Sequence, residues 1–184
     1  MELDKNKLTR LAVRMKKGDR GAAAKLYEEL MPKAYGYFFA RTGKKEASED
    51  LVQDIFLKLV ERIEGFDEAR GSFVVWFWKI ARNMLVDHYR GKKELIFSMF
   101  EEAEVEAMSV IAAPDLDGRL RYRRVQGFLR TLSDEERELF ELRYVAETPY
   151  KEIGEVLGRS EGSLRVAALR LKEKIKKELG ENEI

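Results

Sequence analysis

The hydrophobic residues of this chain recur at intervals of three and four positions, the spacing that places them on one face of an α-helix. In the N-terminal half the pattern predicts four helices. They cover residues 4–17, residues 19–43, a segment with its hydrophobic positions from Val52 to Ile63 on one face and its end at Gly65, and residues 73–90. Asp19 is a favourable N-cap for the second of these helices. Pro32 lies inside the same helix and lacks a backbone N–H, so we expect a break or a kink there.

Four further helices are predicted in residues 119–184. The second of them opens with a capping box, in which Ser133 and Glu136 can each bond the other's backbone N–H. Only three prolines occur, and strong helix formers dominate the composition. The expected fold class is therefore all-α.

The last two predicted helices form a helix-turn-helix pattern. A short helix over residues 149–157, with Thr148 as its N-cap, is followed by a longer one that Ser160 caps and that runs to about residue 179. Gly158 can adopt the left-handed conformation that ends the short helix. The small Gly154 would let the two helices approach closely.

The net charge of +1 conceals an uneven distribution along the chain. Residues 1–93 carry 20 Lys and Arg against 14 Asp and Glu, residues 94–118 carry seven acids and no base, and residues 119–184 carry 15 bases against 13 acids. We therefore expect two small helical domains, 1–93 and 119–184, joined by an acidic linker, 94–118. The cationic domains favour a polyanionic partner, although ordinary solvated surfaces account for the charge equally well.

The composition excludes several kinds of site. Cysteine is absent and His88 is the single histidine, which excludes thiolate metal sites, cysteine nucleophiles and any site with two histidines. No phosphate-binding glycine motif occurs, and we expect no catalytic residue, metal or cofactor. The longest apolar run, residues 73–78, is far shorter than the roughly 20 residues of a spanning helix. We expect a cytoplasmic protein without membrane insertion.

The final helix has the chemistry of a DNA-reading helix. Between Arg165 and Lys177 it carries six bases and one acid. Short polar residues at its N-terminus can reach base edges, and its cations can neutralise phosphates. We interpret it as a recognition helix rather than a solvated basic helix. The candidate contacts to duplex DNA are Ser160, Glu161, Gly162, Ser163, Arg165, Val166, Leu169 and Arg170.

Residues 73–78, with the sequence FVVWFW, are apolar around the whole circumference of the predicted helix. Such a segment is either buried on all sides or exposes a stacking surface. The spacing assigns Trp76 to the core and Trp78, with Val74, to another side. Aromatic rings beside cations suit single-stranded DNA, but aromatic core residues followed by a solvated basic tail fit as well. The candidate contacts are Trp78, Arg82, Asn83, Asp87, Arg90, Lys92 and Lys93.

Several motifs, in this order, resemble the extracytoplasmic-function (ECF) group of bacterial RNA polymerase sigma factors. They are residues 49–57 (EDLVQDIFL), 66–73 with Trp76, 80–83 (IARN), 87–90 (DHYR), 132–138, 142–144, 150–158 (YKEIGEVLG) and 161–165 (EGSLR). The resemblance spans about residues 19–93 and 119–178. Each motif is weak alone, whereas the combination is specific.

The resemblance implies a function for each domain. A sigma2-like domain, 1–93, would bind core polymerase and recognise and melt the −10 element, with a flipped base near residues 66–71. A sigma4-like helix-turn-helix domain (winged-helix-like), 119–184, would bind the −35 element. The implied partners are the β′ clamp helices and β flap of core polymerase, duplex and melted promoter DNA, and an anti-sigma factor. The implied polymerase-binding residues are Glu49, Asp50, Gln53, Asp54 and Leu57.

Two other hypotheses remain open from the residues. The chain could be a helix-turn-helix regulator that is not a polymerase subunit. It could also be a small helical enzyme that uses Asp50, Asp54 and His88, although no activating group accompanies these residues.

Overall fold

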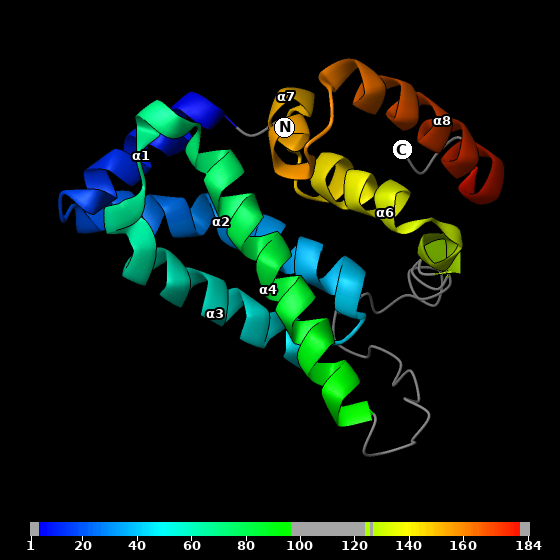
Figure 1. Ribbon diagram of the computed structural model, residues 1–184, viewed down its shortest axis with the longest axis horizontal. Helices are drawn as coiled ribbons and strands as arrows, with labels where there is room; N and C mark the ends of the chain where they lie inside the picture. Colours follow the sequence, from blue (N-terminus) through cyan, green and yellow to red (C-terminus); the bar gives the residue numbers. More distant parts are fainter. Residues whose placement is uncertain (1–3, 97–123, 126, 181–184) are drawn as a thin grey trace. The chain divides into compact units, whose positions relative to one another are not determined.

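The computed structural model describes residues 4–96, 124–125 and 127–180. The regular elements of these residues are all helical, which confirms the expected all-α class. The chain forms two compact units, one containing α1 to α4 and the other α6 to α8 (Figure 1). Most of the expected acidic linker, residues 94–118, lies outside the described residues, so its boundaries stay a prediction.

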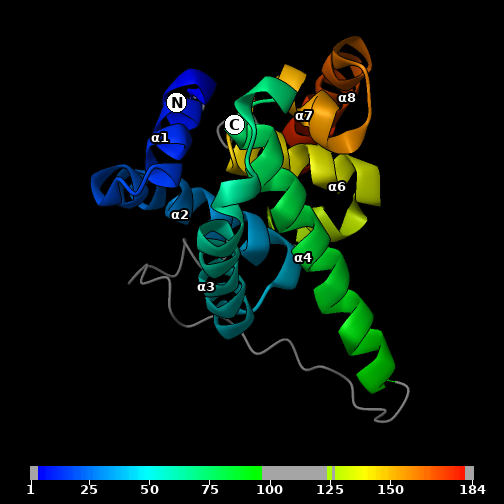
Figure 2. The ribbon, with the colours of Figure 1, turned by 60° about the vertical axis from the view of Figure 1, so that its left-hand side comes forward.

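The first unit consists of four helices and two short 3₁₀ turns. The elements are α1 (Lys5–Lys16), α2 (Arg20–Thr42), α3 (Lys45–Arg62), η1 (Ile63–Gly65), η2 (Glu68–Arg70) and α4 (Phe73–Ile96). As expected, Asp19 caps α2, and its carboxylate accepts the Ala22 N–H at 3.0 Å. The last turns of α4 extend past the other helices of the unit (Figure 2).

Two predicted helix boundaries in this unit were wrong. Pro32 does not break α2, which continues to Thr42. Leu30 and Ala34, on either side of the proline, are fully buried, so packing offsets the roughly 3 kcal/mol that an internal proline costs. Likewise α4 does not end at Gly91 but runs to Ile96, since a glycine inside a helix costs only about 1 kcal/mol.

The first turns of α4 are buried on almost all sides. Phe73, Val74, Phe77 and Trp78 each have 0% exposure, because α1 and α3 pack on α4 and the ring of Tyr37 in α2 lies 5.1 Å from Trp78. The prediction that separated Trp78 and Val74 from the core was therefore wrong. Because three neighbouring helices surround these turns, the expectation that a helix buries one face and exposes the other does not hold there.

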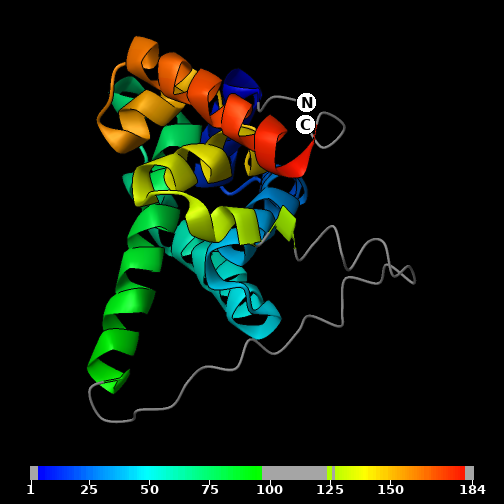
Figure 3. The same cartoon turned by 90° about the vertical axis from the view of Figure 1, so that its right-hand side faces the viewer.

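The second unit begins with helical residues at 124–125 and 127–131 and continues with three named helices. These are α6 (Asp134–Phe140), which passes into a π-helical turn η3 (Glu141–Val145), then α7 (Tyr150–Leu157) and α8 (Glu161–Leu179). The α8 helix lies along α6 (Figure 3). The predicted capping box is present: Ser133 Oγ accepts the Glu136 N–H at 3.3 Å, and Glu136 Oε2 accepts the Ser133 N–H at 3.1 Å.

The turn between α7 and α8 has the predicted glycine geometry. Gly158 adopts φ 69° and ψ 32°, the left-handed conformation. A Cβ on Gly154 would lie 2.6 Å from the carbonyl oxygen of Arg159, so only glycine fits at this close approach. The N-cap of α7 is Pro149 rather than Thr148, which is buried in the preceding turn. The cap prediction was thus one residue early.

Candidate nucleic-acid and polymerase interfaces

The α8 helix separates cleanly into a buried face and an exposed face. Leu164, Ala168, Leu171 and Ile175 are at most 3% exposed and hold the helix on the unit. All eight residues predicted to contact duplex DNA are exposed: Ser160, Glu161, Gly162, Ser163, Arg165, Val166, Leu169 and Arg170. Leu169, at 62% exposure, presents an apolar group beside these polar ones. The helix therefore offers a continuous surface to a ligand.

Arg165 is held in a defined orientation at the start of this surface. Its Nε and Nη2 donate to Glu161 Oε1 at 3.0 and 2.6 Å, and its guanidinium carbon lies 5.0 Å from the centroid of the Tyr150 ring. An arginine has five N–H donors, so three remain, including the pair on the outer Nη1–Nη2 edge. That edge can bind a guanine or a phosphate with two hydrogen bonds.

Arg143 and Tyr150 lie in two of the motifs that carry the resemblance, but their packing beside Arg165 was not predicted. Arg143 lies 4.6 Å from the same tyrosine ring and donates from Nη1 to the Thr148 carbonyl oxygen at 3.2 Å. The ring of Tyr150 therefore contacts both the π-helical turn and the recognition helix. Since Arg143, Tyr150 and Arg165 are well separated in sequence, no local pattern could have shown this contact.

The N-terminus of α8 is partly occupied by its own side chains. Ser160 Oγ accepts the Ser163 N–H at 3.3 Å, so this amide is already used. Arg159 donates to Ser163 Oγ at 3.3 Å and to Glu135 at 3.2 Å. The turn is thereby tied to α6.

On α4, the predicted DNA-contacting residues divide into three groups. Asn83, Asp87 and Arg90 are exposed, with a spacing of four and then three residues that places them on one face, whereas Arg82 is half-buried. Lys92 and Lys93 lie within α4, but their side chains fall outside the described residues.

Trp78 does not belong to this exposed face. Its side chain is 0% exposed, 5.1 Å from both Tyr37 and Phe77 between ring centroids, and no described residue accepts its indole N–H. Trp78 is a core residue that cannot stack on a base in this conformation. The half-buried tryptophan of the helix is Trp76, which the spacing had assigned to the core.

The connection between α3 and α4 has an anchored base and an exposed tip. The buried ring of Phe66 lies 5.5 Å from Phe73 and 5.6 Å from Trp76. The tip is ordered by Asp67, whose carboxylate accepts the Ala69 N–H at 3.0 Å. Residues 67–70 are exposed. The only tryptophan with an accessible ring thus packs beside this loop, within the described residues.

The outer face of α3 collects the residues that the resemblance assigned to polymerase binding. Glu49, Asp50, Gln53, Asp54 and Leu57 are all exposed. Leu57 and Val60 are each 61% exposed and, three residues apart, lie on one face of α3. The hydrophobic pattern predicts Val60 on the buried side of this helix together with Ile55 and Leu59, and its exposure shows that this was wrong. An acidic strip bordered by apolar residues is a surface suited to a protein partner.

Among the described residues, no group of three or more His, Asp or Glu side chains is positioned to hold a metal ion. Within the same residues, no helix is long and apolar enough to cross a membrane.

Comparison with known proteins assigns a family region to each unit. Residues 26–94 match sigma-70 region 2, and residues 122–175 match sigma-70 region 4. The ECF RNA polymerase sigma factor SigW of Bacillus subtilis (strain 168) is 28% identical over 174 residues, covering 90% of this chain and 92% of the relative. The RNA polymerase sigma factor CarQ of Myxococcus xanthus is 29% identical over 171 residues, covering 93% and 97%.

Two solved structures share the fold. The sigma factor RpoE from Bartonella quintana, solved with the anti-sigma factor NepR, has a TM-score of 0.66 at 18% identity, covering 87% of this chain and 98% of that chain. CnrH, solved with the cytosolic domain of CnrY, has a TM-score of 0.64 at 23% identity, covering 93% and 96%.

A helix-turn-helix unit that follows a region 2 unit in one chain defines a promoter-specificity subunit of RNA polymerase. The chain belongs to the sigma-70 family, and within it to the ECF group. A sigma factor binds core RNA polymerase and directs promoter-specific initiation, and the family is not a class of enzymes. The region 2 match favours a sigma factor over a helix-turn-helix regulator that acts without polymerase, because a regulator of that kind does not require a region 2 unit.

Proposed function

We propose a division of labour in which α3 docks on core polymerase, the α3–α4 loop and α4 bind the melted −10 strand, and α8 reads the −35 duplex. The core enzyme supplies all the chemistry, and this chain supplies the choice of promoter. It acts in the cytoplasm, where polymerase and DNA meet.

The observation that carries the −35 assignment is the two-faced character of α8. Its inner face is buried, and its outer face exposes Arg165 and Arg170 with the short polar residues before them. A recognition helix in the major groove needs this arrangement, because base edges are read by side chains near its N-terminus while cations farther along meet phosphates. Leu169 is placed to contact a thymine methyl group.

The −10 assignment rests on α4 and the loop before it. Asn83, Asp87 and Arg90 provide exposed hydrogen-bonding and charged groups on one face. The loop tip, residues 67–70, provides the surface for an extruded base, and Trp76, which is half-buried and lies 5.6 Å from Phe66 at the base of the loop, replaces Trp78 as the candidate stacking ring. Extruding a base costs a few kcal/mol, which contacts of this kind offset.

Two further partners belong to this proposal. RpoE, which shares the fold of this chain, was solved with an anti-sigma factor, and we propose that this chain is also held inactive by such a protein. The second unit meets the β flap, and the acidic linker, residues 94–118, follows the cationic channel of the polymerase.

Reconstituted transcription tests the proposal. Core polymerase is mixed with this chain and a library of promoter-sized DNA fragments, and transcripts are sequenced. We expect initiation at a defined set of sites that share a −35 and a −10 sequence and that core enzyme alone does not use. Absence of initiation from every fragment, together with tight DNA binding by the chain alone, would favour an independent regulator instead.

A further inference from the structure

The helix α1 contacts both ends of the α3–α4 loop through two side chains on one face. Thr9 and Lys16 are seven residues apart, which is about two helical turns. Thr9 bonds to the backbone where the loop enters α4, and Lys16 bonds to the backbone where the loop leaves η1. Both residues precede residue 26, where the region 2 match begins. The contact is thus a feature of this chain that the family match does not cover.

Thr9 provides a cap for α4 from another helix. The N–H of Phe73, the first residue of α4, donates to Thr9 Oγ1 at 3.1 Å. The first N–H groups of any helix have no partner within the helix. The neighbouring Ser72 accepts the Val75 N–H at 3.4 Å, so each of the two hydroxyl groups accepts one of these N–H groups. The bond to Thr9 additionally fixes where the helix starts relative to α1.

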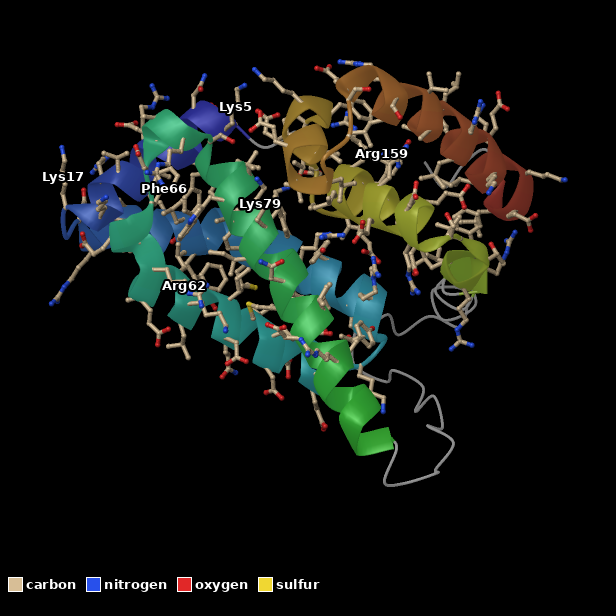
Figure 4. The ribbon with its side chains drawn as sticks, in the orientation of Figure 1. Lys5, Lys17, Arg62, Phe66, Lys79 and Arg159 are labelled. Atoms are coloured by element: carbon tan, nitrogen blue, oxygen red, sulfur yellow. The ribbon has the colours of Figure 1, made fainter. Side chains whose placement is uncertain are left out.

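Lys16 fixes the other end of the loop. Its Nζ donates to the carbonyl oxygen of Phe66 at 2.9 Å. The ring of Phe66 is buried against Phe73 and Trp76, so both the backbone and the side chain of Phe66 are held. Figure 4 shows Phe66 at the base of the loop, beside α1 and α4. Both ends of the exposed tip, residues 67–70, are therefore held against α1.

We propose that Thr9 and Lys16 are positioning residues for −10 recognition: they hold the loop so that its tip and the face of α4 meet the same stretch of melted strand. The inference rests on the proposed function of the loop. A recognition site loses selectivity when its parts shift by about 0.5 Å or more. Freeing the loop therefore lowers discrimination between bases more than it lowers overall binding, because the phosphate contacts of α4 remain.

The test uses holoenzyme reconstituted from the full chain and core polymerase, with a promoter library randomised across the −10 region. The variant carries Thr9→Val and Lys16→Met, which remove both bonds and keep similar side-chain volumes. We expect base discrimination at the position read by the loop to fall about two- to tenfold, the range for loss of one net hydrogen bond. We also expect faster hydrogen exchange of the Phe73 amide.

Three further variants separate the explanations. Lys17→Met removes the adjacent exposed cation, which lies at the end of α1 (Figure 4), and should leave base discrimination unchanged. Thr9→Ser keeps the hydroxyl that accepts the Phe73 N–H, and it should also leave base discrimination unchanged. Asp67→Ala changes the loop tip itself. If that variant alters base preference and the double variant does not, the positioning role is wrong. If neither alters it, the proposed reading of the −10 strand by the loop is wrong.

Discussion

The guanidinium group of Arg165 lies over the ring of Tyr150, 5.0 Å from its centroid. Tyr150 is the first residue of α7 and Arg165 lies in the second turn of α8, so this contact joins the two helices of the helix-turn-helix beside the DNA-reading surface. Glu161 bonds the same arginine from the helix N-terminus. This part of the recognition surface is therefore organised before DNA arrives, which reduces the entropy lost on binding.

Arg165→Ala is expected to weaken binding of the −35 duplex by about 1–3 kcal/mol if the arginine reads a base. If it meets a phosphate instead, affinity should fall for every sequence, and the dependence of log K on log salt should become shallower by about one. Duplex titrations of holoenzyme at several salt concentrations distinguish the two. An unchanged affinity and slope would contradict the assignment of the recognition helix.

Replacing Tyr150 tests whether the ring orients Arg165. Tyr150→Leu removes the cation–π contact and should weaken −35 binding by about 0.5–1 kcal/mol, while Tyr150→Phe keeps the ring and should bind normally. In an Arg165→Ala background the leucine variant should have no additional effect on affinity. An equal loss in both backgrounds would mean that the tyrosine acts on the fold of the unit rather than on the arginine.

Asp54→Arg and Leu57→Asp are expected to impair polymerase binding, each by at least about 1 kcal/mol, since both side chains are exposed on the proposed docking face. Co-purification with core enzyme measures the effect. Glu28→Arg, an exposed charge reversal on α2, is the matched control and should bind normally. Circular dichroism should show the same helicity in all three variants. Retained co-purification of both α3 variants would place the docking surface elsewhere.

Gly154→Ala is expected to destabilise the second unit by about 1–3 kcal/mol, because the new Cβ would lie 2.6 Å from the Arg159 carbonyl oxygen, a backbone atom that can move only if the turn moves. Gly162→Ala provides the opposite case. Nothing lies within 4 Å of its Cβ position, and alanine should stabilise α8 by about 0.5–1 kcal/mol. Hydrogen exchange of α7 and α8 amides in the full chain measures both changes. Equal protection in the two variants would show that the turn tolerates the side chain.

The second unit is expected to lose stability at acidic pH through Glu136. A hydrogen bond from Lys174 and another from the Ser133 N–H hold the pKa of this carboxyl group below its ordinary value. A lowered folded-state pKa means that the stabilisation is complete above the unfolded value of about 4.3 and disappears as the pH falls through the folded value. Glu136→Gln should flatten the fall of unfolding free energy over that acidic range. A slope identical to that of the parent chain would exclude Glu136 as its source.

The local signals of the sequence determined most of the helices and the recognition surface. Caps at Asp19, Ser133 and Ser160 involve residues within a few positions of one another, and their hydrogen bonds were found as expected. The exposed face of α8 followed from its periodicity, because this helix packs against the unit on one side only. Gly158 could be assigned to a tight turn for a similar reason, since its left-handed conformation is a local requirement, and Gly154 to a close approach of the chain beside it.

Only the tertiary structure decided which tryptophan is buried and what holds the recognition surfaces. Helices on several sides of α4 bury Trp78 and leave Trp76 partly accessible. The apolar circumference of residues 73–78 allowed burial on all sides, but it could not show which of the two tryptophans would stay accessible. Thr9 meets Phe73 across 64 positions of sequence, and Tyr150 meets Arg165 only after the chain has turned. Such contacts depend on packing between segments that are separated in sequence. The sequence alone therefore determined the helices and their caps, whereas only the folded structure determined the contacts that hold the recognition surfaces in position.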